Sequence, residues 1–234
     1  MKRETLFIKS GRQFDKYFGS MNPPIYRSST IRFKTFENYC DAKSGSTVFD
    51  VINDGVPRDF SYSSVGTPTT HYLANAIAEL EGAGNALIYP SGLTALTIAT
   101  QTFATSGSHI LIQDNAYERL RRFAHEEIIP KGVEITFFDP NSDIEPFIRS
   151  NTSMILLESP ASLTFELTDI VPIIKLAKER GIITLYDNSW GTPLLFRPLE
   201  HGVDIAMYSL TKYFSGHNDI MMGAVVADGK IFER

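Results

Sequence analysis

This sequence has little cysteine and no long apolar run. Its 234 residues include one cysteine, Cys40, so no disulfide can form within the chain, and a reducing, cytoplasmic location is expected. No run approaches the roughly 18 apolar residues of a membrane-spanning helix. The stretch Met1–Leu6 has no apolar signal-peptide core. These absences argue against a disulfide-stapled extracellular module and against a membrane segment.

Neither sign of charge dominates. The 22 basic and 27 acidic residues give a net charge of −5, which favours neither nucleic acid nor a membrane surface as a partner. A hydrophobic content of 43% and a charged content of 21% are typical of a soluble globular protein. The chain is long enough for one large α/β domain.

What the sequence does contain is an alternation of short apolar runs with helical patterns. Strands are predicted at residues 85–89, 109–113, 133–138, 153–157, 182–186, 204–208 and 222–227. Helices are predicted from Leu93 onward and over Asp169–Arg180. This repeated strand–helix–strand order indicates an α/β fold, a mainly parallel sheet with helices on both faces.

A further helix is predicted to begin after Thr67. Thr67 suits the N-cap and Pro68 the first helical position. Leu73, Ile77 and Leu80 are expected to form its apolar face.

Lys212 follows the predicted strand 204–208, at the sheet edge where α/β folds bind ligands. Its neighbours Ser209 and Thr211 carry hydroxyls. This pattern suits a phosphorylated aldehyde cofactor, because the amine can form a Schiff base while the hydroxyls donate to the phosphate. A solvated loop lysine is the alternative for this peptide alone.

Asp187 ends the predicted strand 182–186 and is expected at the same edge. A carboxylate there can keep a pyridine nitrogen protonated, although Asp before a turn is also an ordinary turn residue. The turn at residues 90–92, with Gly92 and Leu93 opening a helix, can bind phosphate through unpaired backbone N–H groups. A simple serine cap and tight turn is the alternative here.

The stretches S-L-T-K-Y-F-S-G-H-N-D (209–219) and Y-D-N-S-W (186–190) resemble the Cys/Met-metabolism family of pyridoxal-phosphate (PLP) enzymes. The resemblance runs from about Asn22 to the last residue. It implies the large domain of the aspartate-aminotransferase fold, PLP as cofactor, and a homodimer or homotetramer. It also implies that Tyr117 stacks on the cofactor ring and assists proton transfer, a role that the residue type alone does not indicate.

The family pattern is broken at one position. In the family, a Tyr and an Arg two residues later hold the phosphate of the neighbouring subunit's cofactor. Tyr62 matches the Tyr, but Ser64 stands at the Arg position. Arg58 lies six residues from Ser64, about 20 Å away in an extended chain at about 3.3 Å per residue. Arg58 is therefore not a simple replacement.

The resemblance also suggests a domain division. Residues 1–60 are expected to be an N-terminal arm, extended at residues 22–31 because prolines forbid a helix there. Residues 61–234 are expected to be the PLP-binding large domain, with the family's C-terminal small domain absent. A non-catalytic PLP-binding fragment, or half of a split enzyme, is therefore an alternative to an active enzyme.

Within the family, the chain most resembles the cystathionine β-lyases. Three local matches carry this reading, at residues 115–118, 138–140 and 158–162. The implied reaction is α,β-elimination of an amino-acid thioether, cystathionine, to homocysteine, pyruvate and ammonia. Lys212 would remove the α-proton, and Lys212 or Tyr117 would protonate the leaving thiolate. A γ-lyase, a γ-synthase or a methionine γ-lyase type remains open, because these enzymes share the cofactor residues.

Overall fold

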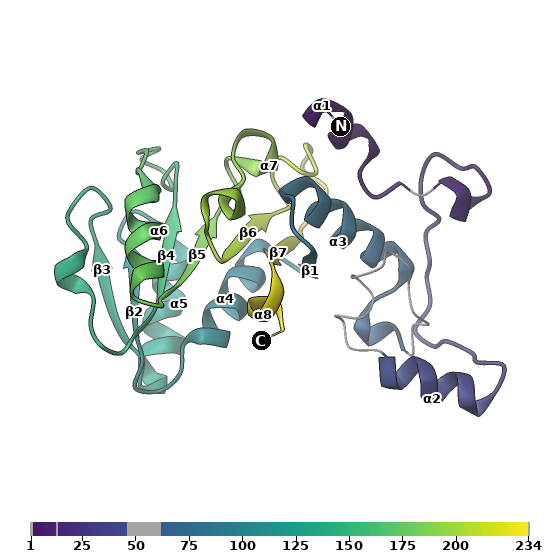
Figure 1. The fold of residues 1–234 in the computed structure, drawn as a ribbon, viewed down its shortest axis with the longest axis horizontal. Coiled ribbons are helices and arrows are strands. Elements are labelled where there is room, and N and C mark those ends of the chain that lie inside the picture. The colour runs from purple at the N-terminus through teal and green to yellow at the C-terminus, as the bar shows by residue number, and fades with distance from the viewer. Residues whose placement is uncertain (1, 13, 46–61, 234) are drawn as a thin grey trace.

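The computed structural model of the chain describes residues 2–12, 14–45 and 62–233. Its centre is a sheet of seven strands in the order β1-β7-β6-β5-β4-β2-β3 (Figure 1). The strands are β1 (Asn85–Tyr89), β2 (His109–Gln113), β3 (Glu134–Phe138), β4 (Thr152–Glu158), β5 (Ile183–Asp187), β6 (Ile205–Ser209) and β7 (Gly223–Ala227). All the predicted strands are present, with ends that differ by no more than a residue.

The sheet is mainly parallel, as predicted. Strands β3, β2, β4, β5 and β6 pair in parallel, and only β7 runs antiparallel to its neighbours β6 and β1. The carboxyl ends of the parallel strands therefore lie along one edge. That edge is where ligands bind in open α/β sheets.

Helices cover both faces of the sheet. The helices are α1 (Arg3–Lys9), α2 (Phe36–Gly45), α3 (Pro68–Glu81), α4 (Gly92–Phe103), α5 (Glu118–Phe123), α6 (Ile170–Glu179), α7 (Thr192–Leu195) and α8 (Gly229–Phe232). Apolar residues of α4 and α5 pack on one face, with Ile110 and Ile112 of β2. Residues of α6 pack on the other face with Leu111, and α3 packs on that face farther along, at β6 and β7. The alternation of side chains along buried strands produces these two cores.

Helix α3 begins as predicted, and two of its three predicted apolar residues, Ile77 and Leu80, are buried. Thr67 caps it in a capping box with Thr70, and Pro68 is its first residue. Leu73, expected on the apolar face, is 37% exposed. Ala74 and Ala78 complete the buried face with Ile77 and pack against the sheet.

The N-terminal residues form two short helices, α1 and α2, that the sequence patterns did not predict. Residues 22–29 contain no helix or strand, which fits the extended arm, and Thr30 makes an isolated bridge with Tyr62. In Figure 1, α2 lies beyond α3, away from the sheet, whereas α1 lies nearer α7, where the Arg3 side chain donates to the carbonyl of Pro193. The boundary at residue 60 falls outside the described residues and stays a prediction.

Within the described residues, no helix is both long and apolar enough to cross a membrane. In the same part of the chain, no cluster of His, Cys, Asp and Glu could hold a metal ion.

Candidate active site

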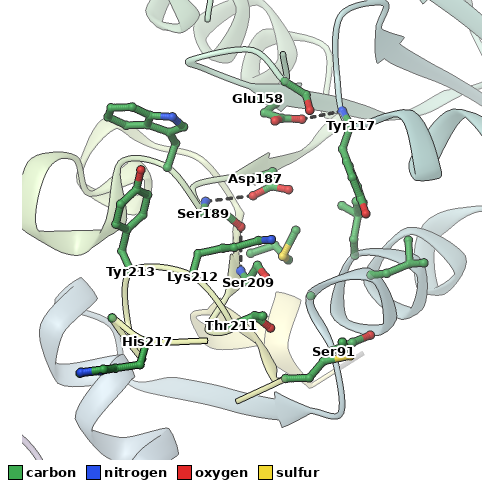
Figure 2. Close-up of a pocket in the computed structure, with 18 residues that line it drawn as sticks. Ser91, Tyr117, Glu158, Asp187, Ser189, Ser209, Thr211, Lys212, Tyr213 and His217 are labelled. Carbon is green, nitrogen blue, oxygen red and sulfur yellow. Dashed lines mark hydrogen bonds between the residues drawn. The ribbon is translucent and has the colours of Figure 1, made fainter. Parts of the chain in front are cut away.

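An open pocket of about 790 Å³ lies at the carboxyl edge of the sheet (Figure 2). Three neighbouring strands end in it. Glu158 is the last residue of β4, Asp187 of β5 and Ser209 of β6. The N-terminus of α4 closes another side through Gly92 and Leu93. The pocket therefore combines strand ends with a helix N-terminus.

The structure brings most of the predicted site residues together here. The pocket is lined by Lys212, Asp187, Gly92, Leu93, Ser209, Thr211 and Tyr117. Tyr62 does not line it; its side chain is 52% exposed and lies outside this chain's pocket. Ser64 is also exposed, in the 3-10 turn η2 (Ser63–Val65), and Arg58 lies outside the described residues. Their predicted role at a neighbouring subunit stays a prediction.

Lys212 follows β6 in a turn held by main-chain bonds. Its backbone N–H donates to the carbonyl of Ser209 at 3.2 Å, and its own carbonyl accepts from the N–H of Gly216 at 3.0 Å. Figure 2 shows its side chain reaching into the pocket beneath Asp187, with Tyr117 on the opposite wall. Among the described residues, the Lys212 amine has no carboxylate within ion-pair distance. It is placed to react with a ligand.

Asp187 is held by the loop that follows it. Its carboxylate accepts a hydrogen bond from the Ser189 backbone N–H at 2.9 Å. The Ser189 hydroxyl in turn accepts from the Ser209 N–H at 2.7 Å, which ties the ends of β5 and β6 together. Burial raises the pKa of the Asp187 carboxyl, and the bond to Ser189 opposes that shift.

Glu158 is a second carboxyl at the same edge. It accepts a hydrogen bond from the Tyr117 backbone N–H at 2.7 Å. Burial, followed by the nearby charge of Asp187, raises the pKa of Glu158 to about 8. No basic side chain among the described residues is bonded to Glu158 or Asp187. The two acids thus lack a countercharge that a cationic ligand would provide.

The other end of the pocket is shaped for close contact with backbone. A Cβ atom at Gly92 would lie 2.7 Å from the Cβ of Ser209, and one at Gly223 would lie 2.3 Å from the carbonyl oxygen of Ser91. Only glycine permits this approach of the α4 N-terminus to β6 and β7. Ser91 caps α4 by accepting from the Thr94 N–H at 3.0 Å. The unpaired N–H groups and the helix dipole here favour an anion such as phosphate.

The two predicted phosphate-binding hydroxyls differ. The Ser209 hydroxyl makes no hydrogen bond to another described residue and is available to a ligand. The Thr211 hydroxyl donates to the carbonyl of Met222 at 3.2 Å and accepts from the Met222 N–H at 3.0 Å. Its single proton is engaged with the main chain of the segment before β7, so Thr211 must rotate before it can donate to phosphate.

Several lining residues were not predicted from the sequence. They are Ser91, Leu96, Glu158, Ser162, Ser189, Trp190, Met207, Tyr213, Gly216, His217 and Met221. Glu158 carried a usable signal, because it also ends an apolar strand at the carboxyl edge. The same rule that selected Asp187 would have selected it. Trp190 and Tyr213 lie near each other in the pocket lining, with ring centroids 5.8 Å apart.

These features fit PLP. The Lys212 amine suits its aldehyde, the Gly92 turn and the Ser209 hydroxyl suit its phosphate, and the buried acids suit its protonated ring nitrogen. Fold and pocket together define the cofactor-binding domain of a PLP-dependent enzyme of the aspartate-aminotransferase type.

Comparison with known proteins identifies the family. Residues 4–234 match the model of the Cys/Met metabolism PLP-dependent enzymes. The chain belongs to this family, as its motifs predicted, and PLP is the cofactor of the family.

Two curated relatives illustrate the range of activities. An L-alanine/L-glutamate racemase of Wolbachia pipientis wMel is 60% identical over 233 residues, which cover 100% of this chain and 58% of the relative. A cystathionine β-lyase of Haemophilus influenzae is 34% identical over 98% of this chain and 57% of the relative. The chain therefore spans little more than half the length of these proteins.

Solved structures agree on the fold. MetB from Corynebacterium glutamicum superimposes with a TM-score of 0.86 at 29% identity, over 100% of this chain and 57% of that one. A cystathionine γ-lyase from Lactobacillus plantarum, complexed with L-serine, gives 0.86 at 28% identity, over 100% and 56%. The predicted fold class is confirmed.

Proposed function

We propose that this chain is the cofactor-binding large domain of a PLP-dependent enzyme that removes the α-proton of an amino acid. The observation that carries this proposal is the convergence of Lys212, Asp187, Gly92 and Tyr117 in one pocket. These residues come from separate elements and meet only because the sheet brings their strand ends together.

Each residue has a role that follows from its place. When bound, the cofactor supplies an electron-accepting ring that stabilises negative charge at the substrate Cα. Asp187 holds the ring nitrogen in its protonated form. Ser209 and the α4 N-terminus bind the phosphate. Lys212 is the base that removes the α-proton, and Tyr117 covers the pocket and can pass a proton.

The first candidate reaction is α,β-elimination of cystathionine to homocysteine, pyruvate and ammonia. It is supported by the β-lyase-like motifs at residues 115–118, 138–140 and 158–162 and by the likeness to the Haemophilus influenzae enzyme. Lys212 or Tyr117 would protonate the leaving thiolate.

Amino-acid racemisation is a second candidate, supported by the 60% identity to the Wolbachia racemase. It begins with the same loss of the α-proton, followed by return of a proton to the opposite face of Cα. Lys212 and Tyr117 lie on opposite sides of the pocket in Figure 2 and are suited to such a pair of acid–base groups.

Product analysis tests both reactions. The purified chain, loaded with PLP, is offered L-cystathionine and L-alanine, with Lys212→Ala as the control. Pyruvate from cystathionine would support the lyase and D-alanine the racemase, whereas 2-oxobutyrate would indicate a γ-lyase. Cofactor binding without any product would overturn the catalytic proposal for this chain alone and favour a non-catalytic fragment or a split enzyme.

Assembly belongs to the same proposal. We infer a homodimer or homotetramer in which Tyr62 serves the neighbouring subunit's cofactor, because its side chain is exposed and outside the pocket of its own chain. Analytical ultracentrifugation of the purified chain would test this; a monomer at micromolar concentration would contradict it.

A further inference from the structure

Glu158 connects two parts of the pocket that are distant in the sequence. Its carboxylate accepts the backbone N–H of Tyr117, the residue that precedes α5. Its own main chain is fixed by the side chain of Gln113 on β2. Gln113 Nε2 donates to the Glu158 carbonyl at 2.8 Å, and Gln113 Oε1 accepts from the Glu158 N–H at 3.2 Å. Glu158 is thus a rigid anchor for the start of α5.

The same residue lies beside Asp187. In the parallel pairing of β4 with β5, Glu158 and Asp187 are the last register partners. Neighbouring strands lie about 4.8 Å apart, so the side chains of register partners, which point to the same face, are close together. Both carboxyls line the pocket (Figure 2). The charge of one therefore acts on the other.

Asp187 is the acid that acts most strongly on Glu158. The ionisable groups around Glu158 come from β5, from the start of α5 and from across the pocket; they are Asp187, Tyr186, Tyr117 and Lys212. From β2 it meets only the neutral Gln113. Burial and then the charge of Asp187 raise the pKa of Glu158 to about 8. Glu158 therefore gains its negative charge as the pH rises through that value.

We propose that Glu158 is a positioning residue of this site, which fixes Tyr117 through its backbone N–H and sets the charge at the strand ends together with Asp187. The second part of this proposal rests on the proposed function, since it requires the cationic ring of PLP beside Asp187. The first part does not, because the Tyr117 bond exists in the chain without cofactor.

Amide hydrogen exchange tests the first part. Glu158→Ala removes the acceptor, and Glu158→Gln retains an amide oxygen that can accept the same bond. At pH 6.5, where Glu158 is neutral, exchange at the Tyr117 amide should accelerate about fivefold or more in the Ala variant, since a hydrogen bond is lost. It should stay within about threefold of wild type in the Gln variant. Glu118→Gln makes the same chemical change next to Tyr117, outside the pocket, and should leave the exchange unchanged.

Cofactor affinity against pH tests the second part. The ratio of PLP dissociation constants, Glu158→Gln over wild type, cancels every pH-dependent contribution that the two proteins share. This ratio should be near one at pH 6.5, where the side chain at position 158 is neutral in both proteins. It should rise to about three- to tenfold at pH 9, where ionised Glu158 attracts the cationic ring. The same ratio for Glu118→Gln should stay flat.

The outcomes are distinct. Unchanged Tyr117 exchange in Glu158→Ala would overturn the anchoring role, even if the variant binds no cofactor. If Glu158→Ala fails to fold, Glu158→Met fills a similar volume without an acceptor oxygen and takes its place, and unchanged Tyr117 exchange in that variant would overturn the anchoring role in the same way. A ratio that stays constant with pH would overturn the charge role. A wild-type chain that binds no PLP would overturn the proposed function and the charge role, while the exchange experiment would still decide the anchoring role.

Discussion

The buried acids of this molecule fall into two groups, Glu81 alone and the pair Asp187 and Glu158, which differ in the partners that the chain gives them. Glu81, at the end of α3, is fully buried, and burial raises its pKa to about 7. It accepts hydrogen bonds from the Tyr208 hydroxyl and, at 3.3 Å, from the Leu199 N–H, and it lies near the charge of Arg197. Every partner of Glu81 comes from the chain itself.

The acids at the strand ends have fewer partners within the chain. Asp187 and Glu158 accept backbone N–H groups from Ser189 and Tyr117, and the rest of their surface faces the pocket. The contrast distinguishes a buried acid that stabilises the scaffold from buried acids prepared for a ligand. Burial raises the pKa in both places, so the shift alone does not identify a site; the missing partners do.

The two groups are physically joined. The Asn188 side chain donates to the Tyr208 hydroxyl at 3.2 Å and to the Phe196 carbonyl at 2.8 Å. Asn188 directly follows Asp187, and Tyr208 directly precedes Ser209. The network around Glu81 therefore holds the loop and the strand that present the pocket's functional groups.

Removing the charge of Asp187 should have the largest effect. Asp187→Asn no longer favours the protonated ring nitrogen, and turnover in any active assembly should fall by about a hundredfold or more, as when a preorganised electrostatic contact is lost. Steady-state rates with equal cofactor loading measure this. An Asn variant that works as well as wild type would make Asp187 an ordinary turn residue.

Glu81 should instead affect the pH dependence of stability. Its pKa rises from 4.5 to about 7 on folding, so the folded chain retains a proton that the unfolded chain releases. The free energy of unfolding should therefore fall between pH 4.5 and 7, by roughly 3 kcal/mol, and level off above pH 7. Glu81→Gln should lack this component.

Urea unfolding of both proteins at several pH values measures the difference. Glu79→Gln, an exposed acid on the same helix, is the matched control. A Glu81→Gln protein whose stability changes with pH as the wild type does would contradict the assignment.

Ser64→Arg should produce the smallest of these effects. An arginine here would restore a charge-assisted contact to the neighbouring subunit's phosphate, worth roughly 1.5–3 kcal/mol, or about one to two decades in PLP affinity. The gain should appear only in the oligomer. Unchanged affinity in a confirmed dimer would show that another group supplies the charge, or that the shared site does not form.

The parts of the site that the sequence predicts are those specified by short continuous segments of the chain. Asp187 stands directly after one apolar run and Lys212 a few residues after another, and parallel strands place such ends at one edge. Glu81 could not be found this way, because its partners Tyr208 and Leu199 are 127 and 118 residues away. A glutamate at a helix end is ordinarily solvated.

The other differences also depend on tertiary contacts. The Thr211 hydroxyl bonds to Met222 because the segments around β6 and β7 run side by side, a pairing that no local pattern reveals. Leu73 was assigned to the buried face of α3 from spacing alone. Ile77 and Leu80 of the predicted face are buried, but Ala74 and Ala78 pack against the sheet beside Ile77, and Leu73 is left partly exposed.

The central claim is that the pocket holds PLP on Lys212, and covalent labelling tests it most directly. The chain is incubated with excess PLP, reduced with borohydride and digested, and the modified peptide is mapped by mass spectrometry. We predict a phosphopyridoxyl group on Lys212 and its loss in Lys212→Ala. Modification of another lysine in its place, or none with cofactor in excess, would contradict the account.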